Sequence, residues 1–423
     1  MITVENIKTD AGASEIVVSA SVRAAVPLPD RMWFEVPAGL SANVAVDVDP
    51  FLPVLMIVGM AYHLPLEVPE VSTELLHGCT RVMEIYEAWS TELGDSLRRI
   101  PIRASGRPRE RRGRAAGAFF SGGVDSTYTV LRNHDRYPPG DARRIQYLIL
   151  GHGLDVALDN QDLFSRVVAT AHEFAQAHDV ELIPVRTNVR AFTSEIDWGH
   201  YAHGACLAAV GHVLAPLLHA LYVASSYWFT TLKPWASHPD IDSRWSSERI
   251  EFVHHGLEAT RADKMLRIAA SDVALRTLRV CWRNADNTFN CGRCEKCLRT
   301  MFALSCCGAL ERASRFPSRL DPALIAQLTL KRSEVPFWED NLRLAGGRAA
   351  DPRLVETLRR TLEGLRFRQT AIGHVDAAIR SAFSRFGLTT ERLKRWDQRH
   401  LKSSLTHVIR AVKHRAGGQG PAL

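Results

Sequence analysis

Six consecutive residues combine the properties that phosphate binding requires: Ser121, Gly122, Gly123, Val124, Asp125 and Ser126. The two glycines let the backbone turn tightly and approach a ligand closely, and the serine hydroxyls can donate hydrogen bonds. An apolar run precedes them and a helical pattern over residues 127–133 follows, so free amides at the helix start add donors and positive potential. This setting predicts a phosphate-binding loop between a strand and a helix; the alternative is a turn that only caps the helix.

A second group consists of thiols with the spacing C-x9-C-x2-C-x2-C: Cys281, Cys291, Cys294 and Cys297. Thiolates at C-x2-C spacing can converge on one tetrahedral ion, Gly292 eases the tight turn between two of them, and four sulfur ligands saturate Zn²⁺. The pattern predicts a closed, structural zinc site, with an iron–sulfur cluster or a redox-active C-x-x-C pair as alternatives. Cys306 and Cys307 are expected to be small buried residues.

The letters of the loop resemble the S-G-G-x-D-S signature of the PP-loop ATP pyrophosphatases, the adenine nucleotide alpha hydrolase-like superfamily, and the chain contains no Walker A sequence. The resemblance implies ATP as cofactor, cleaved between its α and β phosphates, together with Mg²⁺. It also implies that the two glycines, Ser121 and Ser126 hold the departing pyrophosphate, and that Asp125 lies near the phosphates and their Mg²⁺.

The run from Cys291 to Arg299, together with Cys281, is similar to the zinc motif that closes the 7-cyano-7-deazaguanine synthases. Those enzymes adenylate a carboxylate, let ammonia displace AMP and repeat the activation to reach a nitrile. The similarity covers residues 117–310 and implies an ATP-dependent ligase or synthase that forms C–N bonds through an adenylated intermediate. The implied partners are a small-molecule or peptide carboxylate and ammonia or an amine. The regions on either side have no counterpart in the compact synthases, so the activation chemistry carries over better than the identity of the substrate.

Two further residues fall where PP-loop enzymes contact the nucleotide. His152 lies in a glycine-flanked segment after the second core strand, where a solvated loop histidine is the alternative. Lys264 lies at the start of a predicted helix and resembles a lysine that the family directs at the ATP phosphates; the alternative is an exposed helix position. Asp125 and Lys264 are the predicted catalytic residues.

The segment after the fourth core strand is the predicted substrate pocket, because ligands bind beyond the carboxyl ends of parallel strands. By position alone, its candidate residues are Ser225, Ser226, His238 and Asp242. The sequence here matches no known substrate loop of the synthases, so the pocket is predicted without a particular substrate.

These residues need a scaffold, and from Gly117 onward short apolar runs alternate with helical stretches. This alternation predicts the α/β class, with a doubly wound parallel sheet of the PP-loop type. The expected core strands are residues 117–120, 145–150, 180–185 and 220–225. The expected domains are an N-terminal α+β domain (1–102) with a helix at 73–93, an Arg-rich linker (103–116), the PP-loop domain (117–316) and a helical, basic C-terminal region (317–423).

A net charge of +7 indicates a basic surface that attracts phosphates, nucleotides or nucleic acid without choosing among them. The basic residues at 103–114 and 392–414 give slight support to a second interpretation, a PP-loop enzyme that thiolates tRNA, although nucleic acid is not the favoured partner. A third interpretation is a zinc-stabilised scaffold that binds ATP without splitting it.

The clustered cysteines predict a cytoplasmic protein, and so does the strand-like alternation of polar and apolar residues over Met1–Ser19, which does not resemble a secretory signal. Phe51–Tyr62 is too short to span a membrane, which takes about 20 apolar residues. The uncharged segment 199–232 is predicted to be a buried helix followed by a central strand, so no membrane contact is expected. The sequence is compatible with a homodimer.

Overall fold

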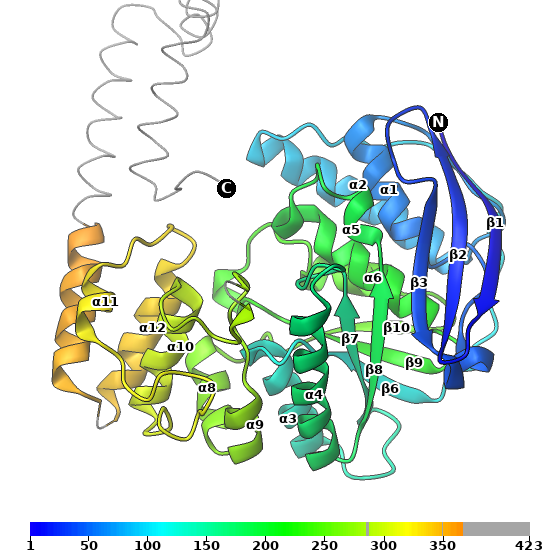
Figure 1. Ribbon diagram of the computed structural model, residues 1–423. Helices are drawn as coiled ribbons and strands as arrows, with labels where there is room; N and C mark the ends of the chain where they lie inside the picture. Colours follow the sequence, from blue (N-terminus) through cyan, green and yellow to red (C-terminus); the bar gives the residue numbers. More distant parts are fainter. Residues whose placement is uncertain (285–286, 349, 367–423) are drawn as a thin grey trace, which may run out of the picture. The chain divides into compact units, whose positions relative to one another are not determined.

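The computed structural model describes residues 1–284, 287–348 and 350–366 (Figure 1). The chain divides into two compact units, residues 1–291 and residues 292–423. The basic segment at residues 392–414, which was expected to be helical, lies outside the described residues.

The first unit is built on a ten-stranded sheet in the order β10-β9-β6-β7-β8-β3-β2-β1-β4-β5. The strands are β1 (Ile2–Ala11), β2 (Glu15–Ala24), β3 (Arg31–Pro37), β4 (Leu66–Glu67), β5 (Ile102–Arg103), β6 (Ala115–Phe119), β7 (Ile145–His152), β8 (Glu181–Thr187), β9 (Leu218–Ala224) and β10 (Glu251–His255). Strands β6 to β10 run parallel to one another. The chain proceeds from β6 outward to β8 and then returns to the other side of β6 for β9 and β10, so the winding direction reverses between β6 and β9.

Helices cover both faces of the parallel strands, in two groups that are visible in Figure 1. The helices of this unit are α1 (Leu52–Tyr62), α2 (Thr73–Leu93), α3 (Val124–Arg136), α4 (Gln161–Ala177), α5 (Val189–Phe192), α6 (His203–Val213), α7 (Pro239–Asp242), α8 (Arg261–Ala269) and α9 (Asp272–Thr277). Successive strand residues point to opposite faces. In β7, Ile149 belongs to the apolar cluster that includes residues of α1, α2 and α6. Helices α3 and α4 also contact the sheet, and α8 and α9 pack against these two helices.

The strands expected in residues 117–316 are confirmed. All four core strands form, within a few residues of their expected limits, and the helix at residues 73–93 has the expected bounds. The uncharged segment 199–232 folds as a short π-helix (Trp198–Ala202), then the buried helix α6 and the interior strand β9. No helix among the described residues is long and apolar enough to cross a membrane.

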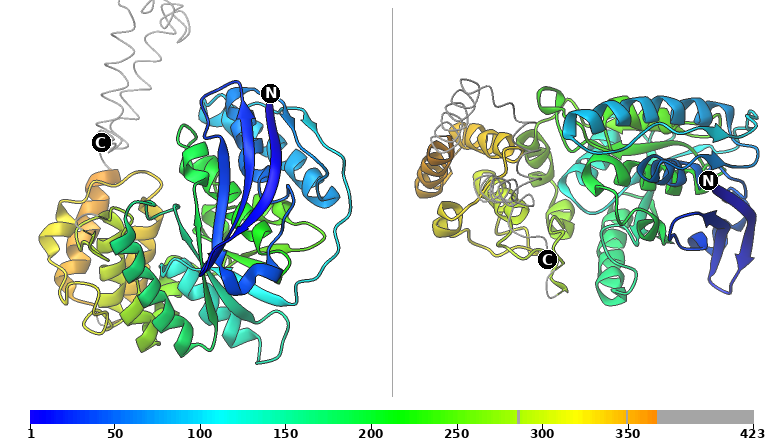
Figure 2. Two further views of the ribbon diagram at one scale, coloured as in Figure 1. Left: turned by 45° about the vertical axis from the view of Figure 1, so that its right-hand side comes forward. Right: turned by 90° about the horizontal axis from the view of Figure 1, so that it is seen from above.

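The N-terminal residues do not form a separate domain, which corrects the expected boundary at residues 103–116. Strand β3 pairs antiparallel with β8, so β1 to β5 extend the parallel strands into one sheet (Figure 2). The Asn188 side chain strengthens this junction, because it accepts a hydrogen bond from the Trp33 amide (3.0 Å) and donates one to the Arg31 carbonyl (2.8 Å). Residues 1–102 therefore share a hydrophobic core with the segment that carries the phosphate loop.

The Arg-rich segment is an ordered, ion-paired part of the first unit and not an open linker. Four of its arginines pair with carboxylates: Arg103 with Glu67, Arg107 with Glu70, Arg109 with Asp49 and Glu70, and Arg112 with Glu110. Arg111 donates to the Glu248 carbonyl at 3.1 Å. The positive charge of this segment is largely matched by acids of the same unit.

The second unit, as far as it is described, is helical: α10 (Glu295–Cys306), α11 (Pro322–Ala326) and α12 (Val335–Gly346). Helix α12 packs on α10, where Trp338 Nε1 donates to the Glu295 carboxylate (2.9 Å) and Asn341 Nδ2 donates to the Arg299 carbonyl (3.0 Å). The Arg299 guanidinium lies over the Phe337 ring, 4.1 Å from its centre. These contacts hold the beginning of α10 in place.

Candidate functional site

The predicted phosphate-binding loop, residues 121–126 (the phosphate loop), lies where the winding direction of the sheet reverses. It follows β6 and leads directly into α3, while the neighbouring strand β9 ends at Ala224, so the segment that begins with Ser225 leaves the sheet beside it. In sheets wound in both directions, ligands bind beyond the carboxyl ends of the strands at this point. The topology thus puts the loop at the expected binding position.

Glycines and serines fix the backbone of the phosphate loop. Gly122 has a φ of +70°, a left-handed conformation that is costly for residues with a Cβ atom. The Ser126 hydroxyl accepts a hydrogen bond from the Ser121 amide (3.3 Å) and donates one to the Gly123 carbonyl (3.2 Å). Gly123 is the N-cap of α3 and makes no side-chain cap hydrogen bond. The N-cap residue itself therefore offers no side chain to the positive end of α3.

Two cations converge on the carboxylate of Asp125 in the first turn of α3. Lys264 Nζ donates to Oδ1 at 2.9 Å, and the Arg261 guanidinium donates to Oδ2 at 2.6 Å. Lys264 Nζ also donates to the Ser225 carbonyl at 2.5 Å, so this one ammonium joins the phosphate loop to the segment after β9. The structure brings both predicted catalytic residues together with one of the predicted substrate residues.

The start of α8 explains how Lys264 reaches this position. Thr260 is the N-cap, its hydroxyl accepts a hydrogen bond from the Asp263 amide, and the Asp263 carboxylate accepts one from the Thr260 amide, which is a capping box. Residues three apart share a helix face, so Arg261 and Lys264 both point at α3. Lys264 is only 2% exposed, which excludes the alternative of a solvated helix position. Arg261 was not among the predicted site residues. The capping box could have identified it, because it fixes the start of α8 and so puts Arg261 on the same helix face as Lys264.

The predicted substrate residues divide between two hydrogen-bonded groups. Ser225 belongs to the Lys264 group, and its own hydroxyl donates to the Tyr227 carbonyl at 2.5 Å. Ser226, the next residue, is partly buried. The Ser225 hydroxyl therefore stabilises the turn after β9. The backbone carbonyl of Ser225 is the atom that contacts Lys264.

Asp242 and His238 belong to the second group, around the short helix α7. The Asp242 carboxylate accepts hydrogen bonds from the Ser237 hydroxyl (2.8 Å) and from His254 Nδ1 (2.6 Å). His238 is the N-cap of α7, with Nδ1 accepting from the Asp240 amide at 3.1 Å, and burial lowers its pKa. Sequence reasoning missed His254, which the alternation of β10 directs toward α7 while its neighbour faces α3.

His152 is a buried strand residue, which corrects the expectation that it lies in the loop after the second core strand. It is the last residue of β7 and is fully buried. Its ring stacks on Phe164 with centres 3.9 Å apart, and Nε2 donates to the Ala157 carbonyl at 3.0 Å. Burial lowers the pKa of His152, so the neutral ring is favoured. The side chain secures the turn after β7 and does not reach out toward a ligand.

The four cysteines of the predicted metal site come together, with all their sulfur atoms within 4.8 Å of one another. Cys281, Cys294 and Cys297 are buried, and Cys291 is partly buried. Zn–S bonds of about 2.3 Å in a tetrahedron put the sulfur atoms about 3.8 Å apart, so this group could hold such an ion with small shifts. Gly292 has a φ of +65°, which confirms its expected role in the turn between ligands.

Cys306 and Cys307 lie apart from this group at the end of α10, and Cys306 is buried as expected while Cys307 is partly buried. Burial raises the pKa of Cys306 to about 12, which keeps the thiol protonated at neutral pH. Cys306 and Cys307 form no disulfide.

A short backbone brace connects the first of these cysteines to the phosphate loop. The Asn290 carboxamide accepts hydrogen bonds from the Val280 amide (2.8 Å) and the Cys281 amide (3.3 Å), and it donates to the Leu278 carbonyl (3.0 Å). The intervening Arg279 amide donates to the Gly122 carbonyl at 2.8 Å. The segment 278–281 is therefore fixed at one end to the glycine turn of the loop.

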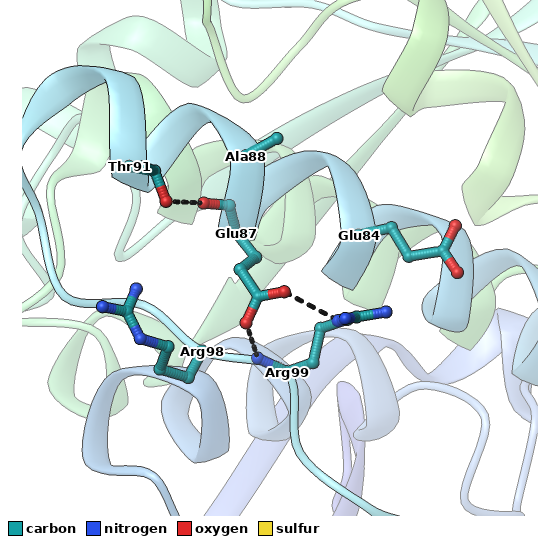
Figure 3. A pocket seen from close by; sticks show the side chains of 6 residues that line it. All are labelled: Glu84, Glu87, Ala88, Thr91, Arg98 and Arg99. Carbon is teal, nitrogen blue, oxygen red and sulfur yellow. Dashed lines mark hydrogen bonds and ion pairs between the residues drawn. The ribbon is translucent and has the colours of Figure 1, made fainter.

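A shallow depression on α2 lies apart from these groups (Figure 3) and is lined by Glu84, Glu87, Ala88, Thr91, Arg98 and Arg99. Its main charges neutralise each other, since Glu87 accepts hydrogen bonds from the Arg99 side chain (2.7 Å) and backbone amide (3.2 Å). These hydrogen bonds lower the pKa of Glu87. None of the predicted site residues lines this depression.

Comparisons with known proteins give no match: no family model, no curated protein and no solved structure matches the chain. What the fold itself defines is an α/β protein with a ten-stranded, mostly parallel sheet and a cluster of four cysteines able to hold a metal such as zinc.

Proposed function

We propose that this protein is an ATP-dependent adenylating enzyme, which converts ATP to AMP and pyrophosphate and activates a carboxylate for attack by ammonia or an amine. The observation that carries the proposal is the convergence of Lys264 and Arg261 on Asp125, at the start of the helix that follows a Gly-Gly turn. The resemblance of residues 121–126 to the PP-loop signature agrees with this position.

In this proposal an oxygen of the carboxylate substrate attacks the α-phosphorus in line, and pyrophosphate leaves toward the loop. Ammonia or an amine then attacks the acyl carbon, and AMP departs. The chain contributes donors that are in place before the reaction: the amides of the loop, the end of α3 and the Lys264 ammonium. Preorganised donors of this kind stabilise the charge of a leaving group by several kcal/mol.

Mg²⁺ fits the carboxylate of Asp125. Carboxylate oxygens are usual ligands of Mg²⁺, and the Asp125 carboxylate lies in the first turn of α3, directly after the loop. The ion would supply positive charge that neutralises the phosphates of the nucleotide. When ATP binds, its phosphates are alternative acceptors for the two cations.

We propose Zn²⁺ as the metal of the four-cysteine group. Four sulfur ligands leave no open coordination position, which suits a structural ion and not a catalytic one. The brace from Cys281 to Gly122 suggests what this ion stabilises, because a bound metal would fix the segment that supports the glycine turn.

The test is release of pyrophosphate from ATP and Mg²⁺ in the presence of a panel of carboxylic acids. We expect release with the wild-type protein, and a loss of about 100-fold or more in Asp125→Asn, because the site loses a charge next to the phosphates. Asp135→Asn is a matched control on the same helix, since Asp135 pairs with Arg267 of α8 on the surface. It should retain wild-type activity.

Two results would contradict the proposal. Equal pyrophosphate release by Asp125→Asn and wild type would show that the loop is not the reaction site. Binding of ATP without release of pyrophosphate for any acid would favour the nucleotide-binding scaffold.

The alternative of a tRNA-thiolating enzyme has less support than the adenylating enzyme, because the arginines of residues 103–114 are largely paired with acids.

A further inference from the structure

A buried arginine that the proposed reaction does not yet use lies against the glycine turn of the loop. Arg279 is 7% exposed, and its Cβ lies 3.8 Å from the position that a Cβ on Gly122 would take. Its backbone amide donates to the Gly122 carbonyl at 2.8 Å, so the side chain starts from a fixed point beside the turn.

The guanidinium of Arg279 has no carboxylate partner among the described residues. One terminal nitrogen donates to the Asn284 carboxamide oxygen at 2.6 Å, and the buried Nε has no hydrogen-bond partner in the described part of the chain. Asp155 and Cys281 act on this charge electrostatically, without forming an ion pair with it within the described ranges of residues. A buried cation without a counter-ion is costly, and such groups are normally paired.

The other buried cations of the described chain follow that rule. Lys264 and Arg261 both bind Asp125, and Arg299 pairs with Glu295 at 3.5 Å. Arg279 is the exception within the described residues, and it is also the one fixed to the phosphate loop. An unpaired guanidinium beside a phosphate-binding turn matches an anionic ligand, since its fork of N–H groups suits phosphate oxygens.

Arg279 borders a small recess at the loop, whose lining is mostly apolar. Ser121, Gly122, Thr170, Thr277 and Arg279 line it together with apolar side chains, and its interior of about 10 Å³ has room for about one water molecule. A phosphate group is larger than this space. The ligand oxygen must therefore be held at the mouth of the recess, which residues of the loop and Arg279 line together.

We propose that Arg279 is a further ligand-binding residue of the phosphate site, which contacts an oxygen of the β or γ phosphate of ATP and retains it in the departing pyrophosphate. The inference rests on the proposed function, because it assumes that the loop binds ATP. It predicts that Arg279 binds the pyrophosphate part of the nucleotide and contributes nothing to the binding of AMP.

The experiment measures binding of ATP, inorganic pyrophosphate and AMP to the full chain by calorimetry. In Arg279→Gln we expect affinity for ATP and pyrophosphate to fall by about 10-fold or more, as expected for loss of a charged hydrogen bond, with AMP affinity unchanged. Arg279→Lys should recover part of the loss. Arg276→Gln is the control, because Arg276 is half-exposed on α9 and pairs with Glu173. It should bind all three ligands like wild type.

Equal pyrophosphate affinity in Arg279→Gln and wild type would overturn the inference while leaving the proposed function intact. An equal loss for AMP and ATP would also overturn it, because that result indicates a structural role. Failure of the wild-type protein to bind either ATP or pyrophosphate would overturn both proposals together.

If the variants do not fold, crystals of the wild-type protein with a non-hydrolysable ATP analogue decide the question. A guanidinium nitrogen of Arg279 within about 3.2 Å of a phosphate oxygen supports the inference. A bound analogue whose phosphates make no contact with Arg279 would refute it.

Discussion

Two positively charged side chains contact the single carboxylate of Asp125, and this excess of positive charge affects the electrostatic potential at the loop. Lys264 and Arg261 approach different oxygens, and both cations are nearly buried. Two cations around one carboxylate give the start of α3 a positive character, which the N-terminal end of the helix increases. An anionic ligand is thus favoured even before Arg279 is counted. The same arrangement suits a nucleotide better than a neutral metabolite.

The metal group leads to a prediction about single side chains. We expect about one zinc ion per chain in the purified protein, measured by mass spectrometry, and its loss in Cys294→Ser, because a hydroxyl is a far weaker zinc ligand than a thiolate. Cys307→Ser is the matched control, since Cys307 is not in the group, and it should keep its zinc. Iron with visible absorption would instead identify an iron–sulfur cluster, and a metal-free wild-type protein would exclude a metal role altogether.

At this scale the sequence predicted residues whose role depends on local spacing. The glycine turn, the four thiols and Lys264 all fall in short motifs, and the structure brings the last of these to Asp125. Arg279 and His254 could not be predicted, because their significance comes from partners far away in the sequence or from the lack of one. His152 was misplaced because the glycines around it suggested a loop, whereas β7 continues to that residue.

At the scale of elements, close contacts between backbones determine how the helices sit on the sheet. Helix α2 has one glycine in its middle, Gly78, at its contact with the 3-10 turn Ser243–Trp245. A Cβ at this position would lie 1.8 Å from the Arg244 carbonyl oxygen, a distance no packed structure allows. The absence of a side chain is therefore what lets the two elements meet.

We expect Gly78→Ala to lower the free energy of unfolding by about 3 kcal/mol, because the clash is with backbone that cannot rotate away. The gain in helix propensity from Gly to Ala, about 1 kcal/mol, works against this loss and is smaller. Gly39→Ala serves as control, since no atom lies within 4 Å of the new methyl group. Urea unfolding monitored by circular dichroism measures both. Equal stability of Gly78→Ala and wild type would show that α2 is not held at this distance.

The elements themselves were largely predictable, but their assembly was not. Apolar runs and helical periodicity marked the core strands and α2, because these signals arise within about 20 residues. The union of the N-terminal strands with the parallel sheet depends on two paired positions, Phe34 with Thr187 and Glu35 with Arg186, and on Asn188. Contacts that are about 150 residues apart leave no periodic pattern, so a domain boundary was expected where the sheet is continuous.

At the scale of the whole molecule, the distribution of charge differs from what the net charge suggests. The chain carries +7, yet the Arg-rich segment finds its carboxylates in the strands and loops of the same unit. Exposed ion pairs add little stability, but they do reduce the local positive potential. The composition could not predict this pairing, since it depends on which acids the fold brings near.

Buried histidines make the stability of the first unit depend on pH. Burial lowers the pKa of His178, His212 and His255 to about 4, against about 6.5 in an unfolded chain. Between these values the unfolded chain binds more protons, so this stabilisation is complete above pH 6.5 and is lost as the pH falls toward 4. Asp49 acts in the opposite direction, because burial raises its pKa to about 6 and its contribution is lost as the pH rises through that value. The combined effect of the three histidines on stability is larger than the opposite effect of Asp49.

We therefore expect the free energy of unfolding to fall between pH 6.5 and pH 5, with a slope that approaches about two protons near pH 5. His212→Gln should reduce this slope by about one proton, because the variant removes a fully buried ring whose Nε2 donates to the Trp245 carbonyl, and the glutamine amide can replace that donor without titrating. His63→Gln is the control, since it makes the same replacement at an exposed position outside the core. Urea titrations at several pH values measure the slopes. A His212→Gln slope equal to that of wild type would mean that the ring is protonated equally in the folded and unfolded chains, and that the acid sensitivity has another origin.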